Sequence, residues 1–594
     1  MAAFYPARSR QLLLALSILL SGSLHAQNLR TDGQRIVNDK NENVVLRGMG
    51  LGGWMLQEGY MLKIYEEGQQ YRIRQRIEEV IGKERTEEFY NAWLANHTRR
   101  ADVDAMAAWG FNSIRLPMHY ALYTLPVDQE PEAGKDTWIE IGFAITDSLL
   151  AWCKANKIYL ILDLHAAPNG QGNDLNISDR DPSKPVLWES KEAQRKTIAL
   201  WRKLAERYAK EEWIGAYDVL NEPNWGFTDP QGDRNGTKEK NNAPVGQFQR
   251  EITEAIRAVD KKHIVIIEGN GWGNNYAGFD PDWDKNMALS FHKYWNYNDS
   301  ASISNMVRMR TKYNLPVWLG ETGENSNTWF TDAIRLFETN NIGWAWWPLK
   351  KIGINNPMEI VSNKDYDSLV SYINKRPGSV KPDPETTYKG LMALAEAAKF
   401  ENTITHRDVI DAMFRQPHTD VTLPYEQRIL GEKSVLRAVD YDLGRNRFAY
   451  YDLDTANFRS AGVNSAGNRG RQYRNDGVDI REEPAKEGAY VVTDIEAGEW
   501  LQYTVEVPVR GEYRISLETA ATGDSGLVVL ENVTRKSKTA ELIIPSTGSE
   551  KEYKATQELV VTLDKGAQVL RIRIIRGGFN LRSIQLQRQC TGSR

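Results

Sequence analysis

Cysteine is nearly absent from this chain of 594 residues, which has only Cys153 and Cys590. Two cysteines cannot form a disulfide framework, so the fold has to be stabilised by hydrophobic cores. Long runs of one charge are also missing: 75 basic residues stand against 79 acidic ones, and the formal net charge is −4. Because no basic stripe is available to bind phosphates, we do not expect nucleic acid as a partner.

Apolar runs long enough to span a membrane are lacking as well. One shorter run, in residues 11–21, follows Arg8 and Arg10 and precedes small residues that end at Ala26. This order of charged, apolar and small residues is typical of a secretory signal peptide. We therefore expect residues 1–26 to be removed, and the mature protein to be secreted, either extracellular or periplasmic, with no membrane attachment.

Tryptophan divides the chain into two parts, because all 18 tryptophans except Trp500 lie between Trp54 and Trp347. In the first part, short apolar runs alternate with longer amphipathic stretches that have helical spacing. The eight runs are residues 44–52, 111–117, 159–166, 214–222, 263–269, 287–295, 316–322 and 342–350. Eight buried strands that alternate with helices predict an α/β fold, the (β/α)8 or TIM barrel, over residues 27–400. A short hairpin is expected before the first strand, where it would close the bottom of the barrel.

The pattern changes after residue 400. Residues 401–432 contain Pro417 and Pro424 and have weak periodicity, so we expect a linker there. From residue 433 to 588, apolar and polar residues alternate between turns, which predicts an all-β sandwich of antiparallel, jelly-roll-like strands. Residues 589–594 would form a tail.

Two glutamates in the first part lie where a buried strand ends: Glu222 in IGAYDVLNEP and Glu321 in PVWLGETG. The carboxyl ends of the strands face the active site in a barrel of this kind. A pair of carboxyl groups there can cleave a glycosidic bond, since one donates a proton to the leaving oxygen and the other attacks the anomeric carbon. We expect Glu222 and Glu321 to be the catalytic residues of a retaining β-glycosidase.

Other polar or aromatic residues also end the predicted strands. They are Arg115, His165, Asn221, His292, Tyr294 and Trp347. We expect Arg115 and Tyr294 to contact Glu321, Asn221 to bind a sugar hydroxyl, and Trp347 to offer an apolar face to a sugar ring. His165 or His292 taken alone is more often a core histidine, and most of the tryptophans of 344–347 are core residues, but core packing does not require the whole set. No cofactor and no metal site are expected, because histidine and cysteine do not cluster.

Seven motifs occur in one order over residues 30–400: RGMGLGGW, SIRLP, LDLHAAPNGQG, VLNEP, SFHKYW, WLGETG and GWAWW. Together they resemble glycoside hydrolase family 5, and specifically its branch similar to exo-β-1,3-glucanases. The resemblance implies that Glu222 is the acid/base, that Glu321 is the nucleophile, and that the six residues above bind the substrate. It also implies a β-glucan-type polysaccharide or oligosaccharide as the substrate. Action on mannan or xylan, and a glycan-binding protein without catalysis, stay open as alternatives, as does endo or exo cleavage.

The second part resembles carbohydrate-binding module family 6 through RAVDYD, AGEWLQYTV and GGFNLRSIQL. Tyr473 and Asn580 match two sugar-binding positions of that family. Arg437, Val439 and Arg582 stand where its calcium ligands would be, so we expect no calcium ion. The resemblance implies an accessory domain that keeps a monomeric enzyme near its polysaccharide.

Overall fold

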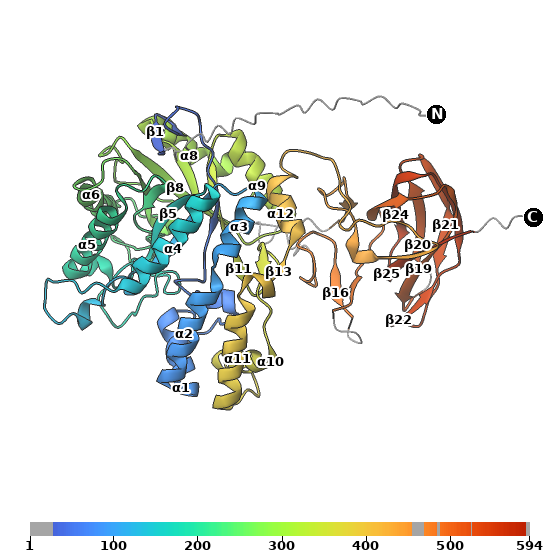
Figure 1. The fold of residues 1–594 in the computed structure, drawn as a ribbon, viewed down its shortest axis with the longest axis horizontal. Helices are drawn as coiled ribbons and strands as arrows, with labels where there is room; N and C mark the ends of the chain where they lie inside the picture. Colours follow the sequence, from blue (N-terminus) through green and yellow to red (C-terminus); the bar gives the residue numbers. More distant parts are fainter. Residues whose placement is uncertain (1–27, 454–467, 484–487, 524–525, 590–594) are drawn as a thin grey trace, which may run out of the picture.

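The computed structural model describes residues 28–453, 468–483, 488–523 and 526–589. The predicted signal peptide, residues 1–26, lies outside these ranges, and so does Cys590. Figure 1 shows a barrel with its helices on one side and a β-sandwich on the other. No helix within the described ranges is both long and apolar enough to cross a membrane.

Eight parallel strands close into a barrel in the order β10-β3-β4-β5-β6-β7-β8-β9. The strands are β3 (Arg47–Gly50), β4 (Ser113–His119), β5 (Tyr159–Ala166), β6 (Ile214–Asp218), β7 (Ile264–Glu268), β8 (Met287–Lys293), β9 (Val317–Gly323) and β10 (Gly343–Trp347). Each overlaps one of the eight apolar runs, because strands covered on both faces need nearly continuous apolar sequence. The predicted TIM barrel is therefore confirmed.

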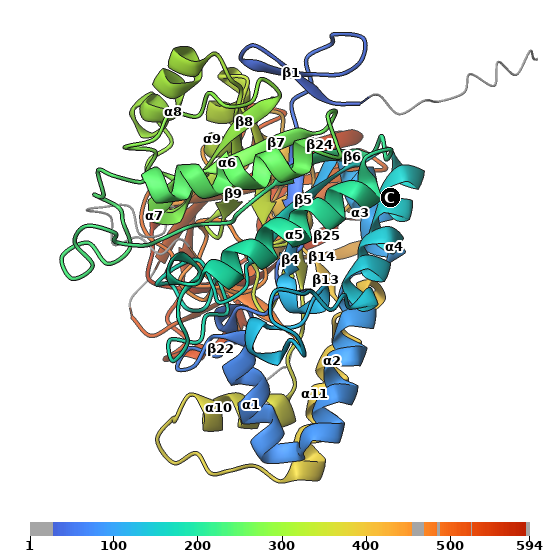
Figure 2. The ribbon, with the colours of Figure 1, turned by 90° about the vertical axis from the view of Figure 1, so that its left-hand side faces the viewer.

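Helices cover the outside of the barrel, as Figure 2 shows for α4, α5 and α6. The covering helices are α3 (Arg100–Trp109), α4 (Glu140–Asn156), α5 (Lys191–Tyr208), α6 (Ala243–Arg257), α8 (Ser300–Tyr313) and α9 (Asn327–Thr339), whereas α7 (Asn270–Gly273) is a short kinked turn after β7. In α5 the buried residues Leu200, Leu204 and Tyr208 recur every four positions, which places them on one face. The helix begins at a Ser190 side chain that accepts a hydrogen bond from the Ala193 amide.

A hairpin precedes the barrel, as expected. Its strands β1 (Arg30–Asp32) and β2 (Arg35–Val37) pair antiparallel, and Gly33 adopts a φ of +56° in the turn. Leu29 and Ile36 pack on apolar residues inside the barrel, among them Ile266. The Thr31 amide also bonds Asn286, just before β8, so the hairpin lies at the amino-terminal end of the strands.

Four further helices extend from the barrel and share a hydrophobic core of their own. They are α1 (Gln70–Ile81), α2 (Lys83–His97), α10 (Lys364–Ile373) and α11 (Pro384–Ala397). A small sheet joins β11 (Lys350–Lys351), β12 (Met358–Glu359) and β13 (Ile404–Thr405).

Residues 401–432, where we expected a linker, contain folded elements. Besides β13 they hold α12 (Arg407–Phe414), which packs against α9. Val409, Ala412 and Met413 of α12 belong to the core of the barrel. The first half of this segment is thus attached to the barrel, because these apolar residues of one short helix are covered by it.

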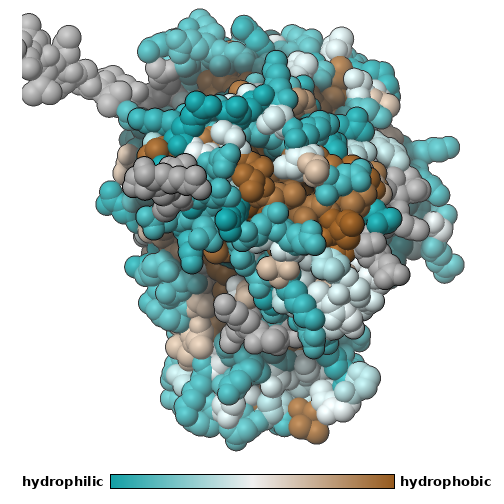
Figure 3. Space-filling model, turned by 90° about the vertical axis from the view of Figure 1, so that its right-hand side faces the viewer, coloured by the Kyte–Doolittle hydropathy of each residue, from teal (hydrophilic) through white to brown (hydrophobic). Residues whose placement is uncertain are grey.

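The second part forms two antiparallel sheets that face each other. One contains β14 (Lys433–Arg437), β16 (Ile480–Glu482), β17 (Tyr490–Val492), β19 (Gly511–Ala521), β22 (Ser549–Ala555), β23 (Leu559–Leu563) and β25 (Asn580–Arg588). The other contains β15 (Tyr450–Tyr451), β18 (Trp500–Val507), β20 (Gly526–Asn532), β21 (Ser537–Ile544) and β24 (Gly566–Arg576). Leu517 and Ile584 of the first sheet share a core with Leu501 and Ile572 of the second, which confirms the sandwich. Figure 3 views the molecule from the side of the sandwich, and it shows a patch of hydrophobic residues surrounded by hydrophilic ones.

Candidate active site

Arg115, on β4, is fully buried among four carboxylates at the carboxyl end of the barrel. Its guanidinium lies 2.9 Å from Glu321 and Asp218, and 3.3 Å from Asp163 and Glu268. Burial opposes the positive charge, but the carboxylates outweigh it, so the pKa of Arg115 is raised well above its ordinary value. A buried ion of this kind is tolerated because its hydrogen-bonding groups are paired, and it holds the surrounding acids in place.

Glu321, on β9, has a hydrogen-bond donor on each carboxylate oxygen. Arg115 donates to Oε2 at 2.9 Å, and the Tyr294 hydroxyl donates to Oε1 at 2.6 Å. Charge-assisted bonds of this type stabilise an ionised carboxylate. Arg115 and Tyr294 therefore hold the Glu321 carboxylate in one orientation.

Glu222 lies just beyond β6 in the left-handed backbone region, with a φ of +44°. Its Oε1 is 2.6 Å from Nδ1 of His292. Burial raises the pKa of Glu222 to about 7; His292 opposes this shift, and the charges of Glu321 and Glu268 add to it. Glu222 consequently keeps a proton near neutral pH, which a general acid requires.

The two glutamates lie close together. One oxygen of Glu222, one oxygen of Glu321 and one ring nitrogen of His292 all fall within 4.8 Å of one another. Retaining glycosidases separate their carboxyl groups by about 5 Å, whereas inverting ones leave room for a water between them. A metal ion would also fit this distance, but Glu321 already has two donors and His292 lies between Glu222 and Glu268, 3.1 Å from the latter.

The remaining predicted residues of the barrel meet at the same place. Asn221 accepts a hydrogen bond from Arg115 at 2.7 Å, and its amide nitrogen is 3.3 Å from His165. The His165 ring stacks on Trp347 with a centroid distance of 5.1 Å and an interplanar angle of 8°. The structure thus brings together all eight barrel residues that the sequence singled out: Arg115, His165, Asn221, Glu222, His292, Tyr294, Glu321 and Trp347.

Two glycines of RGMGLGGW, Gly50 and Gly52, make room for Trp347. A Cβ atom on Gly50 would lie 2.6 Å from its ring, and one on Gly52 would lie 2.5 Å away. A side chain at either position would therefore have to displace the indole.

Several residues of the site were not singled out from the sequence. Asp163, Asp218 and Glu268 are charged residues in otherwise apolar, buried strands. A buried charge in such a strand could have identified them as residues of the site. Glu58 had no such signal because it lies in a loop. It is 3.8 Å from His165, and burial raises its pKa to about 7.

In the sandwich, the ring of Tyr473 is surrounded by other side chains. Tyr490 lies 5.0 Å away and Tyr425 lies 5.8 Å away, centroid to centroid, and the Arg437 guanidinium is 4.9 Å from the ring centre. Asn580 lies at the start of β25 and donates to the Glu550 carbonyl at 3.2 Å. The ring of Tyr473 is therefore partly buried.

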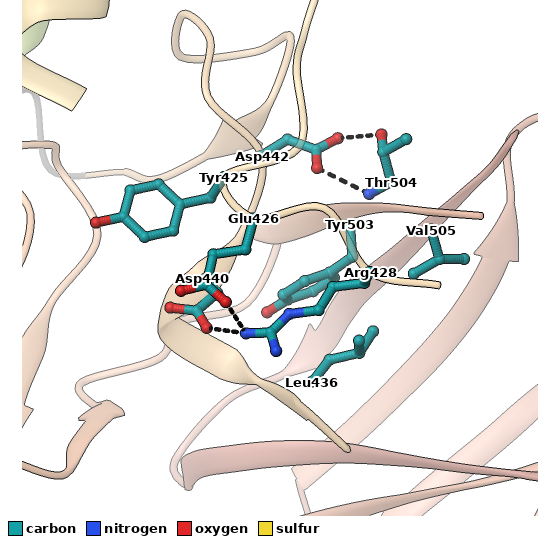
Figure 4. A pocket seen from close by; sticks show the side chains of 9 residues that line it. All are labelled: Tyr425, Glu426, Arg428, Leu436, Asp440, Asp442, Tyr503, Thr504 and Val505. Atoms are coloured by element: carbon teal, nitrogen blue, oxygen red, sulfur yellow. Dashed lines mark hydrogen bonds and ion pairs between the residues drawn. The ribbon is translucent and has the colours of Figure 1, made fainter. Parts of the chain in front are cut away.

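Figure 4 shows a pocket whose wall includes Asp440. The Tyr473 hydroxyl donates a hydrogen bond to this aspartate. Tyr425 and Arg428 reach the pocket from the segment before the sandwich, and Tyr503 lines it from β18. Arg428 is 2.7 Å from Asp440. This guanidinium is therefore already paired within the pocket.

Two segments of the chain match sequence models of known families. Residues 75–352 match the cellulase model, glycosyl hydrolase family 5. Residues 474–585 match the model of carbohydrate binding module family 35. The expected kind of second domain, a carbohydrate-binding module, is confirmed, and the matching model is that of family 35 where we expected family 6.

Curated proteins with similar sequences carry several names. A β-xylosidase of Phanerodontia chrysosporium is 29% identical over 57% of this chain and 74% of its own length. A protein named probable glucan 1,3-β-glucosidase A, of Aspergillus niger, is 26% identical over 36% of this chain and half of its own length. Endoglucanase C of Acetivibrio thermocellus is 26% identical over 51% of this chain and 91% of its own length.

Proposed function

We propose that this chain is a retaining glycosidase that joins a family 5 glycoside hydrolase domain to a carbohydrate-binding module and acts on β-glucan-type chains. The observation that carries the proposal is that a carboxylate oxygen of Glu222 and one of Glu321 lie within 4.8 Å of each other, with Glu321 held by Arg115 and Tyr294. This spacing supports a double displacement.

In the first displacement, an oxygen of Glu321 attacks the anomeric carbon and the glycosidic bond breaks. Glu222 donates its proton to the departing oxygen, so the leaving group departs as a neutral alcohol. Arg115 and Tyr294 hold the attacking carboxylate in one orientation. Asn221 is placed to donate to the sugar 2-hydroxyl, a contact that strengthens in the transition state.

In the second displacement, Glu222 is ionised and takes a proton from water, which attacks the anomeric carbon. The bond to Glu321 breaks, and the configuration of the substrate is retained after two inversions. His292 supports the change of role. Burial lowers its pKa, but Glu268 and Glu222 outweigh this and raise it well above its ordinary value. A protonated His292 stabilises the ionised Glu222.

The names of the relatives support two substrate classes. Glucan 1,3-β-glucosidase and endoglucanase favour a β-glucan, as we expected from the sequence. The β-xylosidase name favours a β-xylan as the second candidate. Mannan is a weaker candidate than either. Product analysis distinguishes endo from exo cleavage.

For the rest of the chain we keep the expectations from the sequence as proposals. Residues 27–400 would be the catalytic domain, residues 433–588 the module with Tyr473 and Asn580 in its sugar site, and residues 1–26 a signal peptide for secretion. We propose a monomer.

The test is hydrolysis of a panel of β-1,3-, β-1,4- and β-1,6-glucans together with xylan and mannan, with the anomeric product followed by NMR. We expect β-configured product from a glucan, and no turnover by Glu222→Gln or Glu321→Gln at unchanged folding. Glu401→Gln, which removes an exposed carboxylate, serves as the control. Product of inverted configuration, or substantial activity in either active-site variant, would overturn the mechanism.

A further inference from the structure

The loop that follows the nucleophile strand is buried beneath the second domain. Asn325 and Asn327, which follow β9, are at most 1% exposed. The Asn475 side chain, from the second domain, donates to the Asn325 carbonyl at 2.8 Å and to Oδ1 of Asn327 at 3.2 Å. The Asn475 carbonyl accepts from the Asn327 amide at 2.9 Å. One residue of the second domain therefore makes three hydrogen bonds to the loop that follows the strand of Glu321.

Two acids complete this junction. Asp408, at the start of α12, accepts from the Asn475 amide at 2.8 Å and from the Asn327 side chain at 2.7 Å. Asp476 accepts from the Asn327 side chain at 3.1 Å and pairs with Arg474 at 2.7 Å. Asp408, Arg474, Asn475 and Asp476 are at most 2% exposed. A buried network with specific donors and acceptors holds its segments in one arrangement, because any shift leaves polar groups unpaired.

The same loop reaches the active site on its other side. Glu324, with a φ of +53°, forms an ion pair of 2.6 Å with Lys351. The Lys351 ammonium lies 5.5 Å from the centre of the Tyr60 ring, and the Tyr60 hydroxyl accepts from Trp347 at 3.0 Å. Glu324 is thus linked through two side chains to the indole that stacks on His165.

Electrostatics also place Glu324 near the catalytic groups. Burial raises the pKa of Tyr294 well above its ordinary value, and the charges of Glu321 and Glu324 add to the shift. Burial likewise raises the pKa of Glu58 to about 7, with a contribution from Glu324. The Glu324 carboxylate can accept hydrogen bonds from sugar hydroxyls, and the Lys351 ammonium can donate hydrogen bonds to them.

We propose that Asn475 is a positioning residue for the active site. It holds the loop from Gly323 to Asn327 so that the Glu324–Lys351 pair binds the hydroxyls of a sugar unit next to the bond that is cleaved. The second domain then contributes to turnover of short, soluble substrates, in addition to any binding of polysaccharide. This inference rests on the proposed glycosidase function.

The test uses the full chain and a soluble oligosaccharide or aryl glycoside of the class that the wild type hydrolyses. Asn475→Ala removes the two side-chain bonds, and we expect KM to rise about tenfold, the effect of one or two lost hydrogen bonds, with a smaller change in kcat. Asn532→Ala is the matched control, since Asn532 is a buried asparagine of the same sandwich that bonds Gln568. Its kinetics should equal those of the wild type. Rates are expressed per active site, titrated with a mechanism-based inactivator, so that a loss of folded enzyme does not count as an effect.

Glu324→Gln tests the other end of the loop without touching the junction. It should raise KM to a similar extent, and the double variant with Asn475→Ala should be no worse than the worse single variant, because both act through one element. Wild-type KM in Glu324→Gln, or wild-type KM and kcat per active site in Asn475→Ala, overturns the inference even if Asn475→Ala folds poorly. Failure of the proposed function looks different, because the wild type itself would then hydrolyse no glycoside.

Discussion

The Glu222 amide donates a hydrogen bond to Oε2 of Glu268, 2.7 Å away. Glu222 adopts a left-handed backbone conformation that a glutamate rarely takes, and this bond helps to hold it there. Glu268 also lies 3.3 Å from Arg115 and 3.1 Å from His292. One buried acid thus connects the proposed proton donor, Glu222, to Arg115, which holds the proposed nucleophile.

Replacing Glu268 by Gln should lower kcat/KM by roughly 100-fold, the low end of a general acid contribution. The amide keeps the size of the side chain, but it loses the charge that raises the pKa of His292 and anchors Glu222. Steady-state kinetics with an aryl glycoside measure the change. Glu338→Gln, which removes a carboxylate bound to Arg47 outside the active site, should leave kcat/KM unchanged. Equal losses in the two variants would contradict the prediction.

The raised pKa of Glu222 predicts a pH dependence of activity. The first displacement needs protonated Glu222, so kcat/KM should fall as the pH rises through about 7. The Glu222→Gln variant can be measured with a dinitrophenyl glycoside, because this leaving group departs without a proton. In the pH profile of the variant, the decrease of kcat/KM above about pH 7 should be absent. A decrease that survives in that variant would assign the titration to another group.

The same shift predicts a pH dependence of stability. The folded state binds the Glu222 proton more tightly than the unfolded state does, so stability decreases as the pH rises from the unfolded value of about 4.5 to about 7. At pH 8, Glu222→Gln should therefore have a free energy of unfolding higher than that of the wild type, by an amount on the order of 1–3 kcal/mol, and a higher melting temperature. At pH 4 the two proteins should differ little. Thermal denaturation at both pH values provides the measurement.

Tyr294→Phe removes one of the two donors to Glu321. A hydrogen bond to a charged group contributes about 1.5–3 kcal/mol, so kcat should fall roughly 10- to 100-fold. Tyr297→Phe provides a control at an exposed tyrosine. Wild-type kcat in Tyr294→Phe would show that Arg115 alone orients the nucleophile.

Gly52→Ala should displace Trp347, because the new Cβ atom would lie 2.5 Å from the indole. Overpacking of this kind costs roughly 1–3 kcal/mol of stability, and the shifted ring should also raise KM. Gly431→Ala, where the nearest atom to the new Cβ is 3.6 Å away, should change neither property. The melting temperature and KM of both variants check the expectation.

The repeating apolar runs were sufficient to predict the barrel, because a buried parallel strand needs continuous apolar sequence and each run has the length of one strand. Glu222 and Glu321 could be predicted as a pair because residues at the carboxyl ends of barrel strands face the same site. Loop residues carry no comparable periodicity, and for this reason Glu58 and Glu324 were not found. Residues 401–432 have weak periodicity as well, and α12 lies there because the barrel covers its short apolar face.

The sequence alone identifies Glu222 and Glu321 as the predicted catalytic pair and places each of them at the end of a strand. Tertiary structure decided their distance and the raised pKa of Glu222, since burial and neighbouring charges exist only once the barrel is closed. It also decided that Asn475 meets Asn327 from a different domain. Side-chain patterns record which face of an element is buried, whereas contacts between distant segments depend on how those elements pack in space.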